Sequence, residues 1–361
     1  MKNDVNIKDL DRQAWINDIF PEWGTYLNEL IEETKVPKGN IAMWWMGCCG
    51  IYLKSPKDCN IIVDLWLDTG KRTRKFPKHP EWGQGKDFQM ARMVGSRQFQ
   101  PNCRAVPMVI DPYEIKKMDA VLSTHFHRDH IDPYVAAAIV KNTKAPFIGP
   151  KYSCDIWRKW GVPEKRIKEV RPGDSIKIKD IEIIATDSFD RTALITAPPA
   201  GDIRGRLPDD MDDRAVNFVF KTPGGTIYHS GDSHMSNYYV KHGKMWDIDV
   251  AFVSYGENPI GCTDKVTSVD CLRMAEDLNT KVIIPIHYDI WTNMLADPME
   301  ILYLYYYRKD RLDYKFHPFI WQVGGGYMYP RDKDKKVFMF ERGFSDAFDL
   351  DEPNVPFKAF L

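Results

Sequence analysis

Three histidines and one aspartate fall within six residues of this chain, directly after a short apolar run. Residues 120–124 read AVLST, as expected for a buried strand, and lead into the segment HFHRDH at positions 125–130. A lone buried histidine is usually a satisfied core residue, but burying all four of these polar side chains without partners would cost several kcal/mol. The H-x-H-x-D-H pattern therefore indicates a metal site at a strand end.

Four further apolar runs also end on aspartate or histidine. The runs and the residues that follow them are 60–63 with Asp64, 181–186 with Asp187, 226–228 with the segment HSGD at 229–232, and 282–286 with His287. Strand ends are rigid, and the loops after them can bring side chains to one point. We therefore expect these residues to converge with 125–130 on a single site.

The order of the expected elements predicts an α/β fold. Residues 41–67 contain three short β-branched or aromatic runs that favour an antiparallel meander, and the second half alternates strands with helices such as 133–141 and 268–278. The 361 residues contain neither a repeat of fixed period nor a low-complexity linker. We expect one domain over 1–361, with a helical extension at 1–40 and an aromatic-rich extension at 291–361 packed on the core.

Composition restricts the class of protein. The chain is 43% hydrophobic and 28% charged, which is typical of a soluble globular protein, and its 50 Lys and Arg balance 51 Asp and Glu. A nucleic-acid-binding protein would usually be clearly basic, so we expect no nucleic-acid partner. No apolar run approaches the roughly 20 residues that span a bilayer, and no signal peptide is evident. We expect a cytoplasmic protein without membrane contact.

The donor types indicate metal-dependent hydrolysis. Imidazole nitrogen and carboxylate oxygen suit Zn, Mn and Fe(II), whereas the seven cysteines are scattered, form no C-x-x-C pair and are interpreted as reduced thiols without a role. A divalent ion lowers the pKa of bound water and polarises a carbonyl or phosphoryl oxygen. Serine or cysteine nucleophiles have no support, because the chain lacks a G-x-S-x-G elbow.

These residues resemble the metallo-β-lactamase superfamily, an αββα sandwich of two mixed sheets with helices on the outer faces and one or two metal ions at the sheet edges. The resemblance implies a role for each of the following residues: His125 and His127 bind the first metal, Asp129 and His130 the second, Asp232 bridges the two, His287 completes the second site, and Asp64 orients a ligand histidine.

Several segments narrow the resemblance to L-ascorbate-6-phosphate lactonases. They are IGP at 148–150, DRTALIT at 190–196, KTPGG at 221–225, YHSGDSH at 228–234, SYGENP at 254–259 and PFIWQVGG at 318–325. The similarity extends over nearly the whole chain. It implies a manganese-dependent enzyme of ascorbate catabolism, with Zn or Fe as less favoured metals, that opens the lactone of L-ascorbate 6-phosphate to 3-keto-L-gulonate 6-phosphate.

One ligand of the superfamily pattern is missing. A third histidine normally completes the first metal site from a loop before the bridging aspartate, but no histidine lies between His130 and His229. Asp187 stands where this ligand is expected, with Asp190 as the alternative. An oxygen donor at this position would favour a hard ion such as Mn²⁺ over Zn²⁺.

The expected mechanism is attack of metal-bound hydroxide on the lactone carbonyl, with Asp129 or Asp232 holding the nucleophile and shuttling its proton. A substrate phosphate requires Arg or Lys, and Arg191 and Arg214 are the candidates, with His234 as a further substrate contact. The expected partner is therefore a small anionic phosphosugar lactone. The numerous aromatic residues also suggest a homo-oligomer.

Two other functions remain open. A phosphodiesterase or RNA-processing nuclease of the same fold would use the same ligands, but it would need a basic surface. A non-catalytic metal-binding regulator could also be built on this scaffold. Such a protein often loses ligands, whereas the main cluster, Asp232 and His287 are all present.

Overall fold

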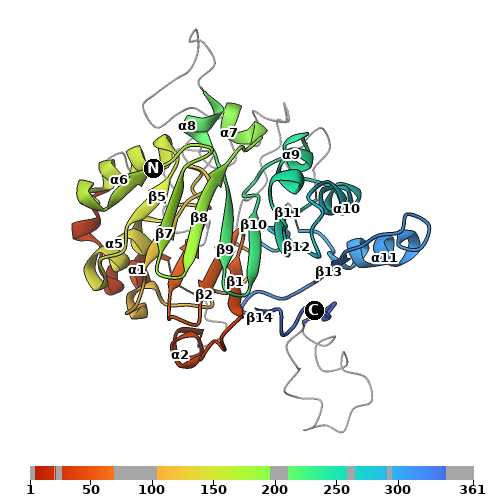
Figure 1. Cartoon of the computed structure of the whole chain (residues 1–361). Coiled ribbons are helices and arrows are strands. Elements are labelled where there is room, and N and C mark those ends of the chain that lie inside the picture. The colour runs from red at the N-terminus through yellow and green to blue at the C-terminus, as the bar shows by residue number, and fades with distance from the viewer. Residues whose placement is uncertain are drawn as a thin grey trace, which may run out of the picture.

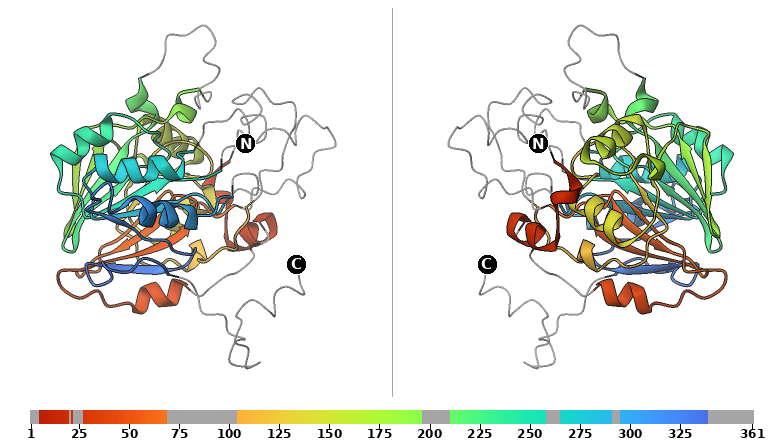
Figure 2. Two further views of the ribbon diagram at one scale, coloured as in Figure 1. Left: turned by 90° about the vertical axis from the view of Figure 1, so that its right-hand side faces the viewer. Right: turned by 90° about the vertical axis from the view of Figure 1, so that its left-hand side faces the viewer.

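The computed structural model describes residues 5–19, 21, 27–68, 104–195, 210–257, 265–290 and 295–338. In these ranges, two β-sheets of seven strands each pack face to face, with helices on both sides (Figure 1, and from two further sides in Figure 2). The expected αββα sandwich with two mixed sheets is confirmed. None of the helices in the described part of the chain is long and apolar enough to cross a membrane.

The first sheet has the strand order β14-β1-β2-β3-β4-β5-β6. Its strands are β1 (Ile41–Gly47), β2 (Gly50–Lys54), β3 (Asn60–Val63), β4 (Ala120–Leu122), β5 (Phe147–Gly149), β6 (Ile167–Glu169) and β14 (Gly326–Tyr329). The neighbours β1–β2 and β2–β3 are antiparallel, as the predicted meander requires, and β14 also pairs antiparallel with β1. Strands β3 to β6 run parallel.

The second sheet has the order β13-β12-β11-β10-β9-β8-β7. Its strands are β7 (Ser175–Ile178), β8 (Ile181–Thr186), β9 (Asn217–Thr222), β10 (Gly225–His229), β11 (Val250–Ser254), β12 (Val282–Ile286) and β13 (His317–Pro318). Strands β10 to β13 are parallel, and β7 to β10 are antiparallel.

Helices cover the outer faces of both sheets. In Figure 1, α1, α5 and α6 lie to the left of the strands, and α9, α10 and α11 to the right. The α-helices are α1 (Arg12–Ile19), α2 (Leu27–Glu33), α5 (Pro133–Asn142), α6 (Lys151–Trp160), α7 (Arg191–Ile195), α8 (Met211–Arg214), α9 (Tyr238–Met245), α10 (Ser268–Asp277) and α11 (Met299–Arg308). Short 3₁₀ turns are η1 (Ile7–Asp9), η2 (Pro112–Glu114) and η3 (Glu164–Arg166).

Strand β1 shows how the layers are built. Side chains alternate across a strand, and β1 places Ile41, Met43 and Trp45 in the core between the sheets. Its other residues, including Trp44, pack in a second core with the helices α1, α2, α5 and α6. The first sheet is therefore apolar on both faces, as a sheet with one helical layer and one sheet layer against it must be.

The C-terminal part of the chain completes both sheets. The described portion of 291–361 was expected to pack on the core, and residues such as Phe319 and Trp321 do so. It also adds β14 beside β1 and β13 beside β12. Pairing with β14 satisfies the backbone groups along one edge of β1, which would otherwise be a long apolar edge strand.

The topology gathers several strand ends at one edge of the sandwich. The carboxyl ends of parallel β3 and β4 lie together, and the β1–β2 turn joins them because Ile51 pairs with Val63. In the second sheet, β10 and β12 end at the same edge, together with β8. Gly231, with φ of +50°, passes so close to Thr124 that a Cβ would meet its Oγ1 at 2.6 Å. This contact joins the two sets of strand ends.

Candidate metal centre

The histidines that follow β4 form one group of potential metal ligands with Asp190. Ligand atoms of His125, His127 and Asp190 lie within 4.8 Å of one another, and all three residues are buried. Nε2 of His125 is 2.9 Å from Nδ1 of His127 and 3.5 Å from Oδ2 of Asp190. Burial lowers the pKa of His125 well below its usual value, and His130 and His127 lower it further. His125 is therefore the neutral imidazole that metal binding requires.

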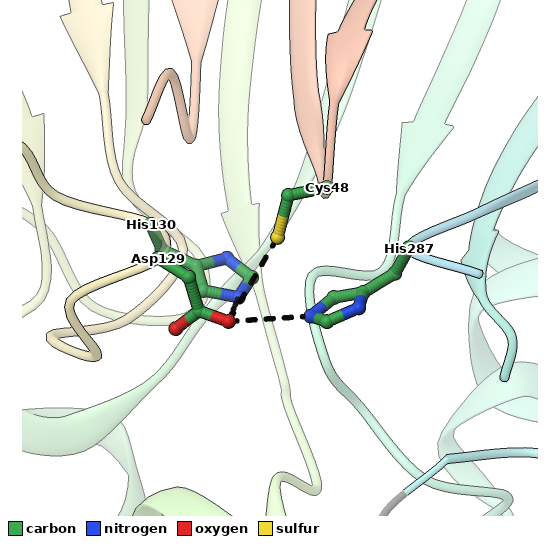
Figure 3. Close-up of side chains that lie close together, drawn as sticks. All are labelled: Cys48, Asp129, His130 and His287. Carbon is green, nitrogen blue, oxygen red and sulfur yellow. Dashed lines mark hydrogen bonds and ion pairs between the residues drawn. The ribbon is translucent and has the colours of Figure 1, made fainter. Parts of the chain in front are cut away.

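A second group gathers around Asp129. Figure 3 shows Cys48, the adjacent Asp129 and His130, and His287 pointing toward one another from three segments of the chain. Oδ2 of Asp129 is 3.5 Å from Nε2 of His287 and 3.8 Å from Nε2 of His130 and from Sγ of Cys48. Burial alone would raise the pKa of Asp129, but His130 and His287 hold it well below its usual value. The carboxylate is therefore ionised and able to accept a cation or a proton.

Asp232 belongs to a further group of potential metal ligands, together with Cys49, His130 and His287. This group shares both histidines with the group around Asp129. Its Oδ2 is 3.4 Å from Nε2 of His130 and 3.5 Å from Nε2 of His287. Burial alone would raise the pKa of Asp232, but His287 and Lys265 hold it well below its usual value. For His287 the balance is reversed, because burial lowers the pKa and the charge of Asp232 raises it well above its usual value.

Asp64 holds the orientation of His130. One of its oxygens, Oδ2, accepts hydrogen bonds from Nδ1 of His130 at 2.9 Å and from Oγ1 of Thr124 at 2.6 Å. The other oxygen accepts the backbone N–H of Thr124 at 2.7 Å. With Nδ1 bound to a carboxylate, the lone pair of His130 is on Nε2, which faces the cluster. This is the orienting position expected for Asp64.

The donor set fits a divalent metal ion. Nε2 of His130 is buried, and it makes no hydrogen bond to any residue that the structure describes, which is a costly state unless another partner binds it. Around it lie imidazole nitrogens and ionised carboxylate oxygens, the ligands of Zn, Mn and Fe(II) sites. Four of the expected ligands after β4, together with Asp232 and His287, therefore converge as the sequence indicates.

The structure does not bring Asp187 to this cluster. Oδ2 of Asp187 accepts hydrogen bonds from Nζ of Lys241 at 2.6 Å and from Nε2 of His242 at 3.2 Å. Asp190, the alternative, lies beside His125 and His127 with its Oδ2. Its Oδ1 accepts the N–H of Ala193 at 2.8 Å in the first turn of α7, and this hydrogen bond holds the side chain in place. Asp190, three residues further along the chain than Asp187, is therefore the carboxylate that lies beside His125 and His127.

The three expected substrate contacts lie in different surroundings. Arg191, the first residue of α7, is exposed, and its backbone N–H donates to Nδ1 of buried His234 at 3.3 Å. Arg214 is 1% exposed, and its guanidinium donates to the carbonyl of Ala193 at 2.6 Å and lies over the ring of Tyr152. Arg214 therefore ties α8 to α7 and α6, which leaves Arg191 as the accessible cation of the pair.

Sequence reasoning missed two cysteines in the cluster. Cys48 and Cys49 form the turn between β1 and β2, and Cys48 has φ of +53°. Sγ of Cys49 lies 3.5 Å from Oδ1 of Asp232. The cysteines were interpreted as scattered thiols without a role, because a chain distance of about 80 residues to the H-x-H-x-D-H segment gave no sign of the contact. The Gly47 and Gly50 that flank the pair were the available signal for a tight turn.

Lys265 is the third residue that sequence reasoning missed. Its Nζ donates to Oδ2 of Asp232 at 2.6 Å and lies 3.1 Å from Nε2 of His287. Lys265 is 5% exposed, so its ammonium group is part of the buried cluster. No motif in the sequence distinguishes this lysine from the many others in the chain.

The fold and this buried set of histidines and carboxylates define a protein of the β-lactamase superfamily. Residues 93–288 match the family model described as the beta-lactamase superfamily domain. Among solved structures, the chain is similar to a possible metal-dependent hydrolase from Veillonella parvula, with a TM-score of 0.57, 15% identity, and coverage of 81% of this chain and 99% of that one. It is also similar to an isothiocyanate hydrolase from Delia radicum gut bacteria, with a TM-score of 0.56 and 16% identity. This match covers 79% of this chain and 98% of that one.

Curated relatives narrow the family. The chain is 56% identical over 357 residues to the probable L-ascorbate-6-phosphate lactonase UlaG of Escherichia fergusonii, covering 98% of this chain and 99% of the relative. The protein of the same name from Escherichia coli O45:K1 gives the same values. The chain belongs to the L-ascorbate-6-phosphate lactonase family of this superfamily, as the sequence segments indicate.

Proposed function

We propose that this chain is a metal-dependent lactonase that hydrolyses L-ascorbate 6-phosphate to 3-keto-L-gulonate 6-phosphate. The observation that carries the proposal is 56% identity over 98% of the chain to relatives named for this activity. The buried cluster at the sheet edge supports it, because the cluster contains the ligand types that a hydrolytic metal centre needs.

His125, His127 and Asp190 would hold the first divalent ion, with Asp232 beside His130 and His287 at the second position. When bound, a divalent ion supplies Lewis acidity, because it lowers the pKa of coordinated water and polarises a carbonyl oxygen. An aspartate in place of a third imidazole makes the first group a harder donor set. We therefore propose Mn²⁺ in preference to Zn²⁺ or Fe²⁺.

Asp129 is the better placed of the two carboxylates to carry a proton. In the net reaction a water oxygen bonds to the lactone carbonyl carbon, the bond from that carbon to the ring oxygen breaks, and a proton from water reaches the ring oxygen. Asp232 already accepts hydrogen bonds from Lys265 and Ser254, and its side chain is 5% exposed, against 17% for Asp129. We assign proton transfer to Asp129 and the placement of negative charge to Asp232.

Arg191 is our candidate for binding the substrate phosphate. It follows the proposed ligand Asp190 directly, its side chain is exposed, and a guanidinium can bind two phosphate oxygens at once. His234 contacts the backbone of Arg191 and would help to position this segment.

The remaining proposals concern the state of the protein in the cell. A phosphorylated lactone is a small anion that its charge keeps inside the cell, so we propose that the enzyme acts in the cytoplasm. We also propose a homo-oligomer, because Tyr303, Tyr306 and Tyr307 are exposed on α11, and exposed aromatic side chains are enriched at interfaces.

The test is turnover by the full chain, without metal and with Mn²⁺, on L-ascorbate 6-phosphate, a simple phosphodiester and RNA. We expect Mn²⁺-dependent opening of the lactone, a large loss in Asp129→Asn, and near wild-type activity in Asp187→Asn, a carboxylate outside the cluster. Turnover of only the phosphodiester or RNA would instead identify a nuclease or phosphodiesterase. An absence of metal-dependent turnover on all three substrates would favour a regulator.

A further inference from the structure

A chain of hydrogen bonds between buried side chains links helix α9 to the segment that precedes α7. We call its five residues, none more than 3% exposed, the polar chain: His242, Tyr228, Asn217, Ser233 and Ser188. Oη of Tyr228 is 2.8 Å from Nδ1 of His242 and 2.8 Å from Nδ2 of Asn217. Oγ of Ser233 is 2.8 Å from Oδ1 of Asn217 and 2.6 Å from Oγ of Ser188. These five residues have no role in the steps described above.

The carboxylate at one end fixes the direction of the polar chain. Nε2 of His242 lies 3.2 Å from Oδ2 of Asp187 and 2.8 Å from Oγ1 of Thr186. Burial alone would raise the pKa of Asp187, but the hydrogen bonds from Lys241 and His242 hold it below its usual value, so the ionised carboxylate only accepts. Burial also lowers the pKa of His242, which keeps the ring neutral near pH 7. Its single proton is therefore on Nε2, and Nδ1 is an acceptor.

Each remaining proton of the polar chain then has one possible direction. Tyr228 donates its only hydroxyl proton to the imidazole, so its oxygen accepts from the amide nitrogen of Asn217. The carbonyl oxygen of Asn217 accepts the proton of Ser233. Oγ of Ser233 is left as an acceptor, for the hydroxyl of Ser188 and for the backbone N–H of Phe189 at 3.1 Å. Hydrogen bonds that all run the same way in a buried site strengthen one another.

The near end of the polar chain holds the segment that we assign to the substrate phosphate. Besides the two bonds to Ser233, the N–H of His234 donates to the carbonyl of Phe189 at 2.9 Å, and the N–H of Arg191 donates to Nδ1 of His234 at 3.3 Å. Four hydrogen bonds thus attach 188–191 to 233–234, and two of them end on one hydroxyl oxygen. The state of Ser233 therefore affects where α7 begins and where the side chain of Arg191 lies.

We propose that the polar chain positions Arg191 for the substrate phosphate, by holding the hydroxyl oxygen of Ser233 as an acceptor for the segment 188–191. Tyr228 and His242 are positioning residues, and they act on substrate binding and not on the bond-breaking step. This inference rests on the proposed function and deepens it, because it assigns how the phosphate site is held. Asp187→Asn keeps an oxygen beside Nε2, and Thr186 supplies another, so the near wild-type activity expected of that variant is consistent with it.

The test removes one hydroxyl from the middle of the polar chain. In Tyr228→Phe, the amide of Asn217 and Nδ1 of His242 lose their common partner. We expect the KM for L-ascorbate 6-phosphate to rise by roughly three- to tenfold, the usual size of an effect transmitted through intermediate residues, with little change in kcat. Tyr52→Phe is the matched control, because Tyr52 is 4% exposed and its hydroxyl also bonds to an asparagine, Asn60 at 2.9 Å, in the first sheet. Its KM should equal that of the wild type.

A double-mutant cycle separates positioning from general destabilisation. If the polar chain acts through Arg191, adding Tyr228→Phe to Arg191→Ala should raise KM no further, whereas independent effects would multiply. Nitrogen NMR of the histidine rings gives a second readout, with the His242 signals identified by their loss in His242→Gln. We expect the tautomer protonated at Nε2 in the wild type, and a proton on Nδ1 would contradict the direction of the chain.

The remaining outcomes also decide the matter. An unchanged KM in folded Tyr228→Phe would overturn the proposal, and so would an equal rise in Tyr52→Phe or full multiplication in the double mutant. If Tyr228→Phe fails to fold, Ser188→Ala, which removes only the last bond of the polar chain, takes its place with the same expected rise. Calorimetric binding of inorganic phosphate to the metal-free full chain is measured in parallel. A wild type that binds phosphate more tightly than the variant but opens no lactone would refute the proposed function and leave the positioning role standing, whereas equal phosphate binding would refute the positioning role.

Discussion

Replacing Asp64 with asparagine changes the proton position on a ligand histidine while keeping the shape of the side chain. Thr124 N–H must keep an oxygen acceptor, because a backbone amide cannot reverse its role. The amide nitrogen of the introduced asparagine would then face Nδ1 of His130, where a carboxylate oxygen lies at 2.9 Å in the wild type. Nδ1 must become the acceptor, and the proton moves to Nε2, the atom that would bind metal.

The expected loss follows from that change of tautomer. Removing a carboxylate that orients a ligand histidine typically costs about 10- to 100-fold in metal affinity, or roughly 1.4 to 2.8 kcal/mol. We place Asp64→Asn at the upper end of this range, because the variant reverses the hydrogen bond in addition to removing the charge. Asp64→Ala would be a poorer experiment, since it leaves buried donors of Thr124 and His130 unpaired and lowers the stability of the fold as well.

The assay is a competition titration of Mn²⁺ between the full chain and a chelator, with thermal unfolding of the metal-free protein measured in parallel. Asp132→Asn is the matched control, because Asp132 is also buried and accepts three backbone N–H groups, from Leu67, Tyr134 and Val135, but no histidine among the hydrogen bonds of the described residues. We expect its affinity to equal that of the wild type. An Asp64→Asn affinity within about threefold of wild type, well below the expected 10- to 100-fold loss, would refute the tautomer argument.

Three further predictions follow from single contacts. Asp190→Ala should lose metal from the first group, whereas Asp187→Ala should keep its full metal content in elemental analysis; the opposite pattern would return the third ligand to Asp187. Arg191→Ala should raise KM for the phosphorylated lactone about tenfold with little change in kcat, since a charge-assisted phosphate contact is worth roughly 1.5 kcal/mol or more; an unchanged KM would exclude Arg191 from phosphate binding. Burial raises the pKa of Asp332, but Arg331, the N–H of Met328 and Lys335 together hold it below its usual value, so its stabilising effect is present above about pH 4 and is lost as the pH falls through the lowered pKa. Asp332→Asn should therefore lower Tm at pH 7 and by less at pH 3, and equal losses at both pH values would contradict this assignment.

The fold was predictable where local signals were strong. A helix was predicted over 133–141, and the structure begins α5 at Pro133, with Asp132 accepting the N–H groups of Tyr134 and Val135. The apolar runs of β1, β2 and β3 likewise form the predicted meander. The pairing of β14 with β1 was not predictable, because it joins Ile41 to Tyr329 across most of the chain and no local pattern specifies a partner at that distance.

The site was predictable to the extent that its residues follow strands. His125 to His130, Asp232 and His287 lie at the ends of apolar runs, and each of these strands was recognisable. The carboxylate beside His125 is displaced by three residues from the one first expected, because the start of α7 at Arg191 carries Asp190, and not Asp187, to His125. Cys48 and Lys265 lie on turns and loops, and their contacts exist only after both sheets have packed.

The position of β14 has a consequence for biosynthesis. Strand β1 is made early, is apolar on both faces and contains Trp44 and Trp45, yet one of its edges is closed only by residues 326–329. Until that segment has been translated, β1 presents an unpaired edge that can pair with another nascent chain. Chains interrupted before residue 326 should therefore aggregate, and a chaperone that shields this edge would raise the yield of the full-length protein.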